Sequence, residues 1–96
     1  MRPSEALAKH RDEVLAIIAR YPVSNPRVFG SVARGEDTEE SDLDLVVEVE
    51  GKFSYFDMAS LALELERVLG CEVDLGTARS LKPFVAEAVA TDLRPL

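Results

Sequence analysis

Hydrophobic and polar residues alternate along one short stretch near the middle of the chain. From Asp42 to Glu50 the even positions are acidic except at Val46, and the odd positions are all apolar. The apolar positions are Leu43, Leu45, Val47 and Val49. A period of two is typical of a β-strand with one packed face and one open face. The same reasoning predicts strands over Asp42–Glu50 and Cys71–Leu75, and a short strand over Arg27–Phe29.

Three other segments place apolar residues at the spacing of a helix. The predicted helices cover Ser4–Arg20, Ser54–Leu69 and Ser80–Leu93, with Ser4 as the N-cap of the first and Gly70 as the C-cap of the second. A single helical turn closed by Gly35 is expected directly after the pair Gly30-Ser31. This order of elements predicts an α+β (α/β-like) fold, in which helices cover one face of a sheet of about three strands.

Composition limits the size and the location of the protein. The chain has 96 residues, of which 47% are hydrophobic, so we expect one domain over residues 1–96 with a real core. The single cysteine, Cys71, excludes an internal disulfide and favours a reducing compartment. We find no secretory signal, and no apolar run approaches the roughly 20 residues of a membrane helix. A cytoplasmic location is therefore expected.

The formal net charge of −7 argues against nucleic acid as a direct partner, because phosphate binding needs a basic face. It is compatible with a basic protein partner or with a site for divalent cations. Acidity that only keeps a small protein soluble explains the charge equally well.

Two carboxylates lie on the open face of the middle strand. Asp42 and Asp44 are at positions i and i+2, so their Cα atoms are about 6.5–7 Å apart on one side of a strand. Such carboxylates repel each other unless a cation lies between them, and Mg²⁺ prefers oxygen ligands of this kind. Two such ions are the usual site of nucleotidyl transfer. Asp74 has the matching parity on the last strand, so it is the candidate third ligand and proton acceptor if the two strands are neighbours.

A Gly-Ser pair supplies the second half of such a site. The glycine at Gly30 lets the backbone approach a phosphate closely, and the Ser31 hydroxyl can donate to a phosphate oxygen. Arg34 either reaches a triphosphate or is a solvated surface arginine, and the sequence favours neither. A structural alternative also remains, in which Asp42 only ends a loop and Asp44 faces solvent on an edge strand.

Together these residues resemble a known signature. "GSVARGEDTEESDLDLVV" resembles the motif of the nucleotidyltransferase superfamily that includes DNA polymerase β: Gly-Ser, about ten residues, then Asp-x-Asp. The short length and the Arg-x-Phe-Gly-Ser lead-in are most similar to the minimal nucleotidyltransferases of bacteria and archaea. The resemblance implies a mixed sheet with two Mg²⁺ ions at Asp42, Asp44 and Asp74, and nucleotide phosphates at Gly30 and Ser31.

The resemblance also implies a substrate and a partner. Members of the minimal branch are commonly antitoxins that transfer AMP from ATP to a tyrosine of a helical toxin of the HEPN class, a ribonuclease. We therefore expect a protein adenylyltransferase that binds such a toxin, with which it could form a hetero-oligomer. Two alternatives stay open. One is an antitoxin that neutralises only by binding, through an apolar patch at Phe53, Tyr55 and Phe56. The other is transfer to a small molecule such as an aminoglycoside.

Overall fold

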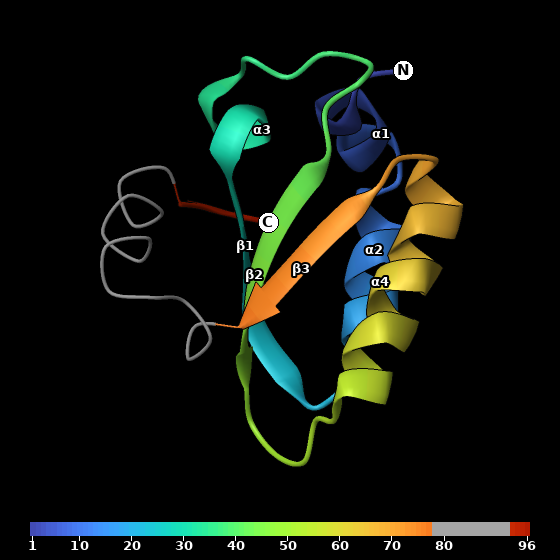
Figure 1. Cartoon of the computed structure of the whole chain (residues 1–96), viewed down its shortest axis with the longest axis vertical. Helices are drawn as coiled ribbons and strands as arrows, with labels where there is room; N and C mark the ends of the chain where they lie inside the picture. The colour runs from blue at the N-terminus through green and yellow to red at the C-terminus, as the bar shows by residue number, and fades with distance from the viewer. Residues whose placement is uncertain (78–92) are drawn as a thin grey trace.

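The computed structural model describes residues 1–77 and 93–96, and these residues form a mixed sheet with helices packed against it (Figure 1). The helices are α1 (Pro3–Lys9), α2 (Arg11–Ile18), α3 (Gly30–Arg34) and α4 (Tyr55–Leu69). The strands are β1 (Val23–Phe29), β2 (Leu43–Val49), β3 (Val73–Thr77) and β4 (Arg94–Pro95). The strand order is β3-β2-β1-β4, with β2 and β3 parallel and the other neighbours antiparallel. Helices α1, α2 and α4 lie together on one side of the sheet, whereas α3 lies apart from them beside β1 and β2.

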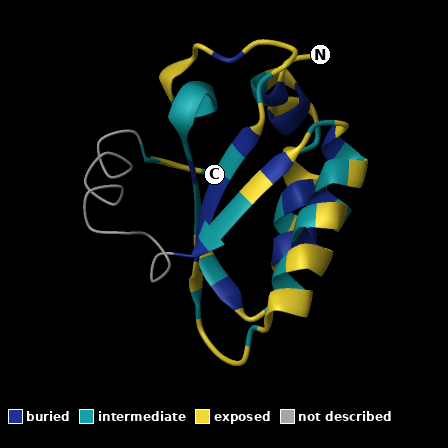
Figure 2. Ribbon diagram, viewed as in Figure 1, coloured by how far each residue is buried: buried dark blue, intermediate teal, exposed yellow. Residues whose placement is uncertain are grey.

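The core confirms the alternation that predicted β2. Leu43, Leu45 and Val47 have no exposed surface and pack in one cluster with Leu61 and Leu65 of α4 (Figure 2). Parallel strands need a crossover connection, and α4 provides it between β2 and β3. The apolar face of β2 is thus covered by the same helix that carries the chain to β3.

Helix α4 agrees with the prediction because both of its ends are encoded locally. Ser54 is the N-cap, and its hydroxyl accepts a hydrogen bond from the backbone N–H of Asp57 at 3.2 Å. The Asp57 carboxylate accepts in return from the Ser54 N–H at 2.9 Å, which completes a capping box. Gly70 closes the helix with a left-handed φ of 71°.

The prediction of one long helix over Ser4–Arg20 was wrong. The chain leaves helical geometry at His10 (φ −110°, ψ 21°), which separates α1 from α2. Ser4 is not the N-cap either, because Arg2 occupies that position and Ser4 lies within the first turn of α1. The apolar stripe still continues across the break, since Leu7 and Val14 are both buried.

Strand β1 begins at Val23, four residues before the predicted start at Arg27, so Asn25 and Pro26 lie within the strand. The two residues form an irregularity in the pairing of β1 with β2. Asn25 has a left-handed φ of 50°, and its side-chain amide donates to the Glu48 carboxylate of β2 at 3.0 Å. Asn tolerates this conformation better than most residues, so the strand continues through a bulge at this position.

Within residues 1–77 and 93–96 the sheet has four strands, where about three were predicted. The additional strand, β4, pairs with β1 through Arg94 and Pro95, a length too short to show any alternation. The helix predicted over Ser80–Leu93 falls on residues 80–92, which lie outside the described part of the chain. Among the helices of residues 1–77 and 93–96, none is both long and apolar enough to cross a membrane.

Candidate active site

Three neighbouring strands bring the predicted acids into one row. Asp44 of β2 is paired with Phe29 of β1 on one side and with Asp74 of β3 on the other. Side chains of directly paired residues project from the same face of a sheet. Leu43 and Leu45 are buried in the core, so this row faces away from it. The structure confirms that the strands of Asp44 and Asp74 are neighbours.

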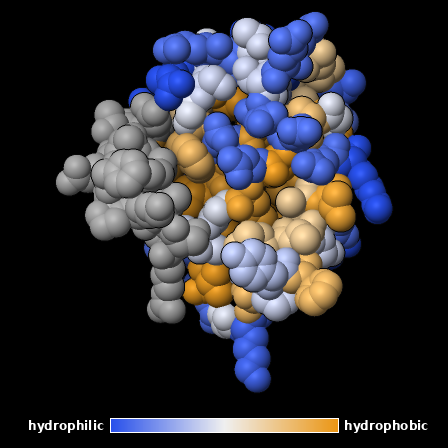
Figure 3. All heavy atoms as spheres, in the orientation of Figure 1, coloured by the Kyte–Doolittle hydropathy of each residue, from blue (hydrophilic) through white to orange (hydrophobic). Residues whose placement is uncertain are grey.

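The three carboxylates differ in exposure. Asp44 is half-buried, whereas Asp42 and Asp74 are exposed. Asp42 directly precedes the first residue of β2, so it lies at the end of the α3–β2 connection and not within the paired strand. The three acids therefore lie at the end of the sheet where β2 and β3 begin. The surface at this end is rich in hydrophilic side chains (Figure 3).

Gly30 touches the middle acid of this row. The glycine follows Phe29, begins α3 and has a left-handed φ of +72°. A Cβ at this position would collide with the Asp44 carboxylate oxygen Oδ2 and lie 3.2 Å from Cγ. Glycine is therefore required both for the backbone conformation and for the approach of Asp44. Ser31, the next residue, is half-buried in the first turn of α3.

The electrostatics of the row favour a bound cation. Partial burial raises the pKa of Asp44, and the negative charges of Asp74 and Asp42 raise it further. The positive charge of Arg34 acts in the opposite direction but does not reverse the shift. A raised pKa means that the ionised carboxylate is held unfavourably at this position. A divalent cation beside it would relieve that cost, so the electrostatics fit a metal ion.

The donor set fits an ion that is shared with a substrate. Within residues 1–77 and 93–96, no three His, Cys, Asp or Glu side chains are close enough together to form a ready-made metal site. Mg²⁺ in nucleotide enzymes is usually held by one or two carboxylates together with substrate phosphates and water, and not by a protein cage. Exposed carboxylates at Asp42 and Asp74 beside Asp44 are compatible with this arrangement.

Arg34 lies at the C-terminal end of α3, where its Nε is 3.6 Å from the Glu36 carboxylate. It is exposed, yet its charge reaches Asp44. The geometry therefore places a cation near the acid row and leaves both earlier interpretations of Arg34 open.

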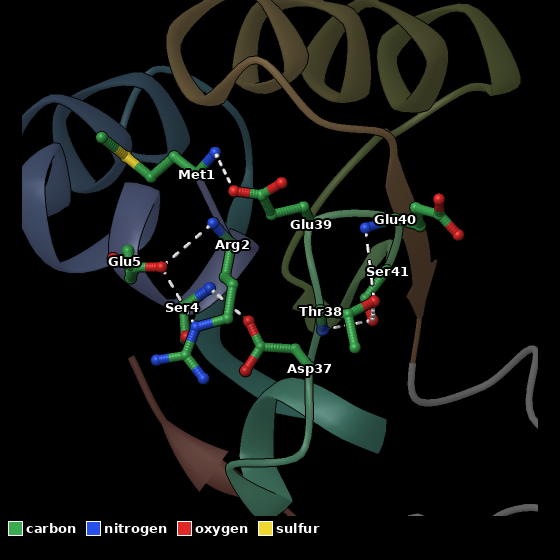
Figure 4. Close-up of polar contacts among 9 residues, drawn as sticks. All are labelled: Met1, Arg2, Ser4, Glu5, Asp37, Thr38, Glu39, Glu40 and Ser41. Atoms are coloured by element: carbon green, nitrogen blue, oxygen red, sulfur yellow. Dashed lines mark hydrogen bonds and ion pairs between the residues drawn. The ribbon is translucent and has the colours of Figure 1, made fainter.

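Sequence reasoning missed Asp37, a buried carboxylate in the connection between α3 and β2. Its side-chain oxygen Oδ2 accepts a hydrogen bond from the backbone N–H of Ser4 at 2.9 Å (Figure 4). Burial acts to raise the pKa of Asp37, but hydrogen bonds from Ser4 and from its own backbone N–H hold the pKa below the usual range. The segment "EDTEES" is uniformly polar, so no sequence pattern distinguishes Asp37 from its neighbours.

The predicted aromatic patch is divided between core and surface. Phe53 is half-buried and stacks edge to face with Tyr21, with ring centroids 6.3 Å apart. Tyr55 and Phe56 are each 88% exposed at the start of α4. Helix α4 follows the C-terminal end of β2, whereas Asp42 precedes its N-terminal end. The exposed aromatic pair and the acids are therefore associated with opposite ends of this strand.

Comparison with known proteins identifies the family. Residues 7–95 match the nucleotidyltransferase domain family, and the chain belongs to this family of enzymes. A candidate protein adenylyltransferase of Methanocaldococcus jannaschii is 40% identical over 92 residues, which is 93% of this chain and 89% of the relative. The protein adenylyltransferase MntA of Thermococcus cleftensis is 37% identical over 87 residues, covering 91% of this chain and 85% of the relative.

Solved structures confirm the fold. The structure of a candidate minimal nucleotidyltransferase superposes with a TM-score of 0.85 and 45% sequence identity, over 97% of this chain and 95% of that one. The MNT antitoxin complex with a tri-AMPylated HEPN toxin of Shewanella oneidensis matches with a TM-score of 0.71. That match has 19% identity over 92% of this chain and 69% of the other, so it shows a shared fold. The chain is thus a minimal nucleotidyltransferase.

Proposed function

We propose that this nucleotidyltransferase transfers AMP from ATP to a hydroxyl of a partner protein and acts in this way as an antitoxin. The proposed acceptor is a tyrosine of a HEPN-type toxin. The contact between Gly30 and Asp44, in a row with Asp74, is the observation that carries the proposal. It is supported by the relatives named as protein adenylyltransferases and by the fold shared with an MNT antitoxin.

The residues of the row divide the chemistry among them. Asp42 and Asp44 would hold divalent ions, with Asp74 as the third ligand. Such ions, when bound, neutralise phosphate charge and lower the pKa of a nearby hydroxyl. The tight turn at Gly30 lets the triphosphate approach the backbone, where the Ser31 hydroxyl donates to a phosphate oxygen. Arg34 would add a positive charge at the rim of this site.

The reaction is an attack by the acceptor oxygen on the α-phosphorus of ATP. A bond forms between that oxygen and the phosphorus, and the bond from the α-phosphorus to pyrophosphate breaks. Asp74, which is exposed and paired with Asp44, would accept the proton of the hydroxyl. The products are an AMP ester on the partner and free pyrophosphate.

The test uses ATP labelled at its α-phosphate, Mg²⁺ and a purified HEPN-type toxin protein. We expect label on the partner with the native chain and none with Asp42→Asn combined with Asp44→Asn. Glu48→Gln is the matched control, because Glu48 lies on the same strand at the far end and Gln can still accept from Asn25. If the partner protein is still labelled by the chain that carries both Asp→Asn substitutions, the proposal is wrong. Mass spectrometry of the labelled partner decides whether the acceptor is a tyrosine.

A second candidate function is neutralisation by binding alone. The observation that favours it is the exposure of Tyr55 and Phe56, which are large apolar side chains in contact with solvent. One experiment, neutralisation of the toxin by variant chains, distinguishes antitoxin action by AMP transfer from antitoxin action by binding alone. If catalysis is required, the Asp42→Asn, Asp44→Asn chain fails to neutralise the ribonuclease at a stoichiometric dose. If binding suffices, that chain neutralises, whereas Tyr55→Ser with Phe56→Ser does not.

A further inference from the structure

The N-terminus of α1 is completed by a side chain from a distant part of the sequence. The N-cap position is held by Arg2, whose side chain has no acceptor atom. Pro3 has no N–H, so the first free donor of the helix belongs to Ser4. Asp37 accepts from this N–H at 2.9 Å across 33 positions of sequence. The carboxylate therefore takes the role that an N-cap Ser or Asp usually has.

Asp37 also begins a tight turn that leads to the acids. The Thr38 N–H donates to the Ser41 hydroxyl at 2.9 Å (Figure 4). The Ser41 N–H donates back to the Thr38 carbonyl at 3.0 Å. These reciprocal bonds make Thr38–Ser41 a compact unit. One end of this unit is held to α1 by Asp37, and the other end continues directly into Asp42.

The two acids of the Asp-x-Asp pair are held in different ways. Asp44 is paired on both sides, to Phe29 and to Asp74. Asp42 lies outside the paired strand, between the Thr38–Ser41 turn and Leu43, whose N–H donates to the Glu72 carbonyl at 2.8 Å, so the turn fixes its place on one side. The burial of Asp37 means that its bond to Ser4 does not compete directly with bulk water. A displacement of the chain at Asp37 would therefore change the position of Asp42 more than that of Asp44.

We propose that Asp37 is a positioning residue, which fixes Asp42 for ion and nucleotide binding by tying the α3–β2 connection to the first turn of α1. This inference rests on the proposed function for the role of Asp42. Loss of a group that orients a metal ligand typically costs about 10–100-fold in metal affinity. A cap that only stabilised α1 would change the melting temperature and leave the affinity of the folded protein for ions unaltered.

The test measures Mn²⁺ binding by electron paramagnetic resonance, with a non-hydrolysable ATP analogue present, together with AMP transfer. Asp37→Ala should raise the Mn²⁺ midpoint about 10–100-fold. Asp37→Asn should leave it close to the native value, because the amide oxygen can still accept from Ser4. Glu40→Ala is the matched control, since it removes an exposed carboxylate from the same connection. Amide hydrogen exchange at Ser4 should speed up in Asp37→Ala and remain slow in Asp37→Asn.

Several results would overturn the inference. A native Mn²⁺ midpoint in folded Asp37→Ala contradicts it, and so does equal damage from the Ala and Asn variants. If Asp37→Ala does not fold, Asp37→Glu takes its place: the charge is kept, but one added methylene displaces the connection. A native midpoint in Asp37→Glu then refutes the role. If the native chain binds Mn²⁺ and transfers no AMP, the proposed function fails while the Ser4 exchange and Mn²⁺ measurements still decide the role of Asp37.

Discussion

Gly30 and Asp44 meet where β1 passes into α3, and the Asp44 carboxylate occupies the space that a side chain at position 30 would need. The Gly-Ser pair and the Asp-x-Asp pair are thus two sides of one contact. A glycine is therefore needed at position 30 for two reasons: the left-handed backbone of the turn and the space taken by the Asp44 carboxylate. The second reason can be tested by mutation.

Gly30→Ala should reduce AMP transfer far more than Gly35→Ala. Both glycines have a left-handed φ, +72° at Gly30 and +71° at Gly35, so both substitutions carry similar backbone strain of about 1–2 kcal/mol. Only Gly30 faces Asp44, because a Cβ at Gly35 meets nothing within 4 Å. Steady-state transfer rates and melting temperatures of the two variants measure the difference. Equal loss of activity in both would mean that strain, and not the approach of Asp44, limits the site.

Asp74→Asn should lower kcat by about 10²–10⁴-fold, the usual contribution of a positioned acid or base. Amide oxygens still bind ions weakly, so the KM for ATP should change less than kcat. Glu72→Gln is the control, since Glu72 is also exposed and lies two positions before Asp74. Rates at several ATP concentrations separate the two parameters. An unchanged kcat in Asp74→Asn would remove Asp74 from the reaction.

Asp44→Asn should stabilise the metal-free protein at neutral pH. The pKa of Asp44 is raised in the folded state, so ionising this group costs more in the folded than in the unfolded chain. Its contribution to stability is present at low pH and lost as the pH rises through the folded pKa. Since Asp44 is only half-buried, we expect a gain of about 0.5 kcal/mol at pH 7, or about 2–4 °C in melting temperature.

Two measurements test whether Asp44→Asn stabilises the metal-free protein for the electrostatic reason given. The difference between native and Asp44→Asn melting temperatures should shrink as the pH falls below about 4 and vanish about one unit lower, where the native carboxyl is protonated in both states. Mg²⁺ with an ATP analogue should then stabilise the native chain more than the variant, because a ligand that binds only the folded state raises its stability. Glu48→Gln removes one charge from the far end of the same strand, so Mg²⁺ with the ATP analogue should stabilise it as much as the native chain. A destabilised Asp44→Asn in metal-free buffer at pH 7 contradicts the electrostatic interpretation.

Ser54→Ala should affect stability and not activity. It removes the hydroxyl that caps α4 and should cost about 1 kcal/mol, which is about 4–8 °C for a domain of this size. The capped end of α4 follows the end of β2 that is distant from Asp42. Ser60→Ala, which loses only an exposed contact with the Tyr21 hydroxyl, is the control. Thermal unfolding and transfer rates of folded protein distinguish the two outcomes.

The sequence predicted the parts of the fold that depend on local signals. The alternation of β2 and the capping box of α4 are both short-range patterns, and both elements agree with the structure to within about a residue. The prediction failed at Ser4, because the cap of α1 is supplied by Asp37 from another region. The predicted start of β1 at Arg27 was four residues late for a similar reason, since a bulge depends on the strand opposite.

In the candidate site, too, the sequence predicted what depends on local pattern and missed what depends on tertiary contacts. Side-chain parity was enough to predict that Asp44 and Asp74 share a face once their strands are neighbours. The collision that excludes a Cβ at Gly30 is a matter of tertiary geometry, and the motif spacing does not contain it. Asp37 was missed because its partner lies in α1 and its own segment is uniformly polar.

The parallel pairing of β2 with β3 has a consequence for how the protein folds. The strands of Asp44 and Asp74 are separated by the whole of α4, so their pairing closes a long loop of chain. Contacts of this kind form slowly, because the entropy of loop closure is lost before the contact compensates for it. A chain emerging from the ribosome therefore has no complete acid row until β3 has been synthesised and docked. AMP transfer then reports the fully folded protein, and any folding intermediate that lacks the β2–β3 pairing is catalytically silent.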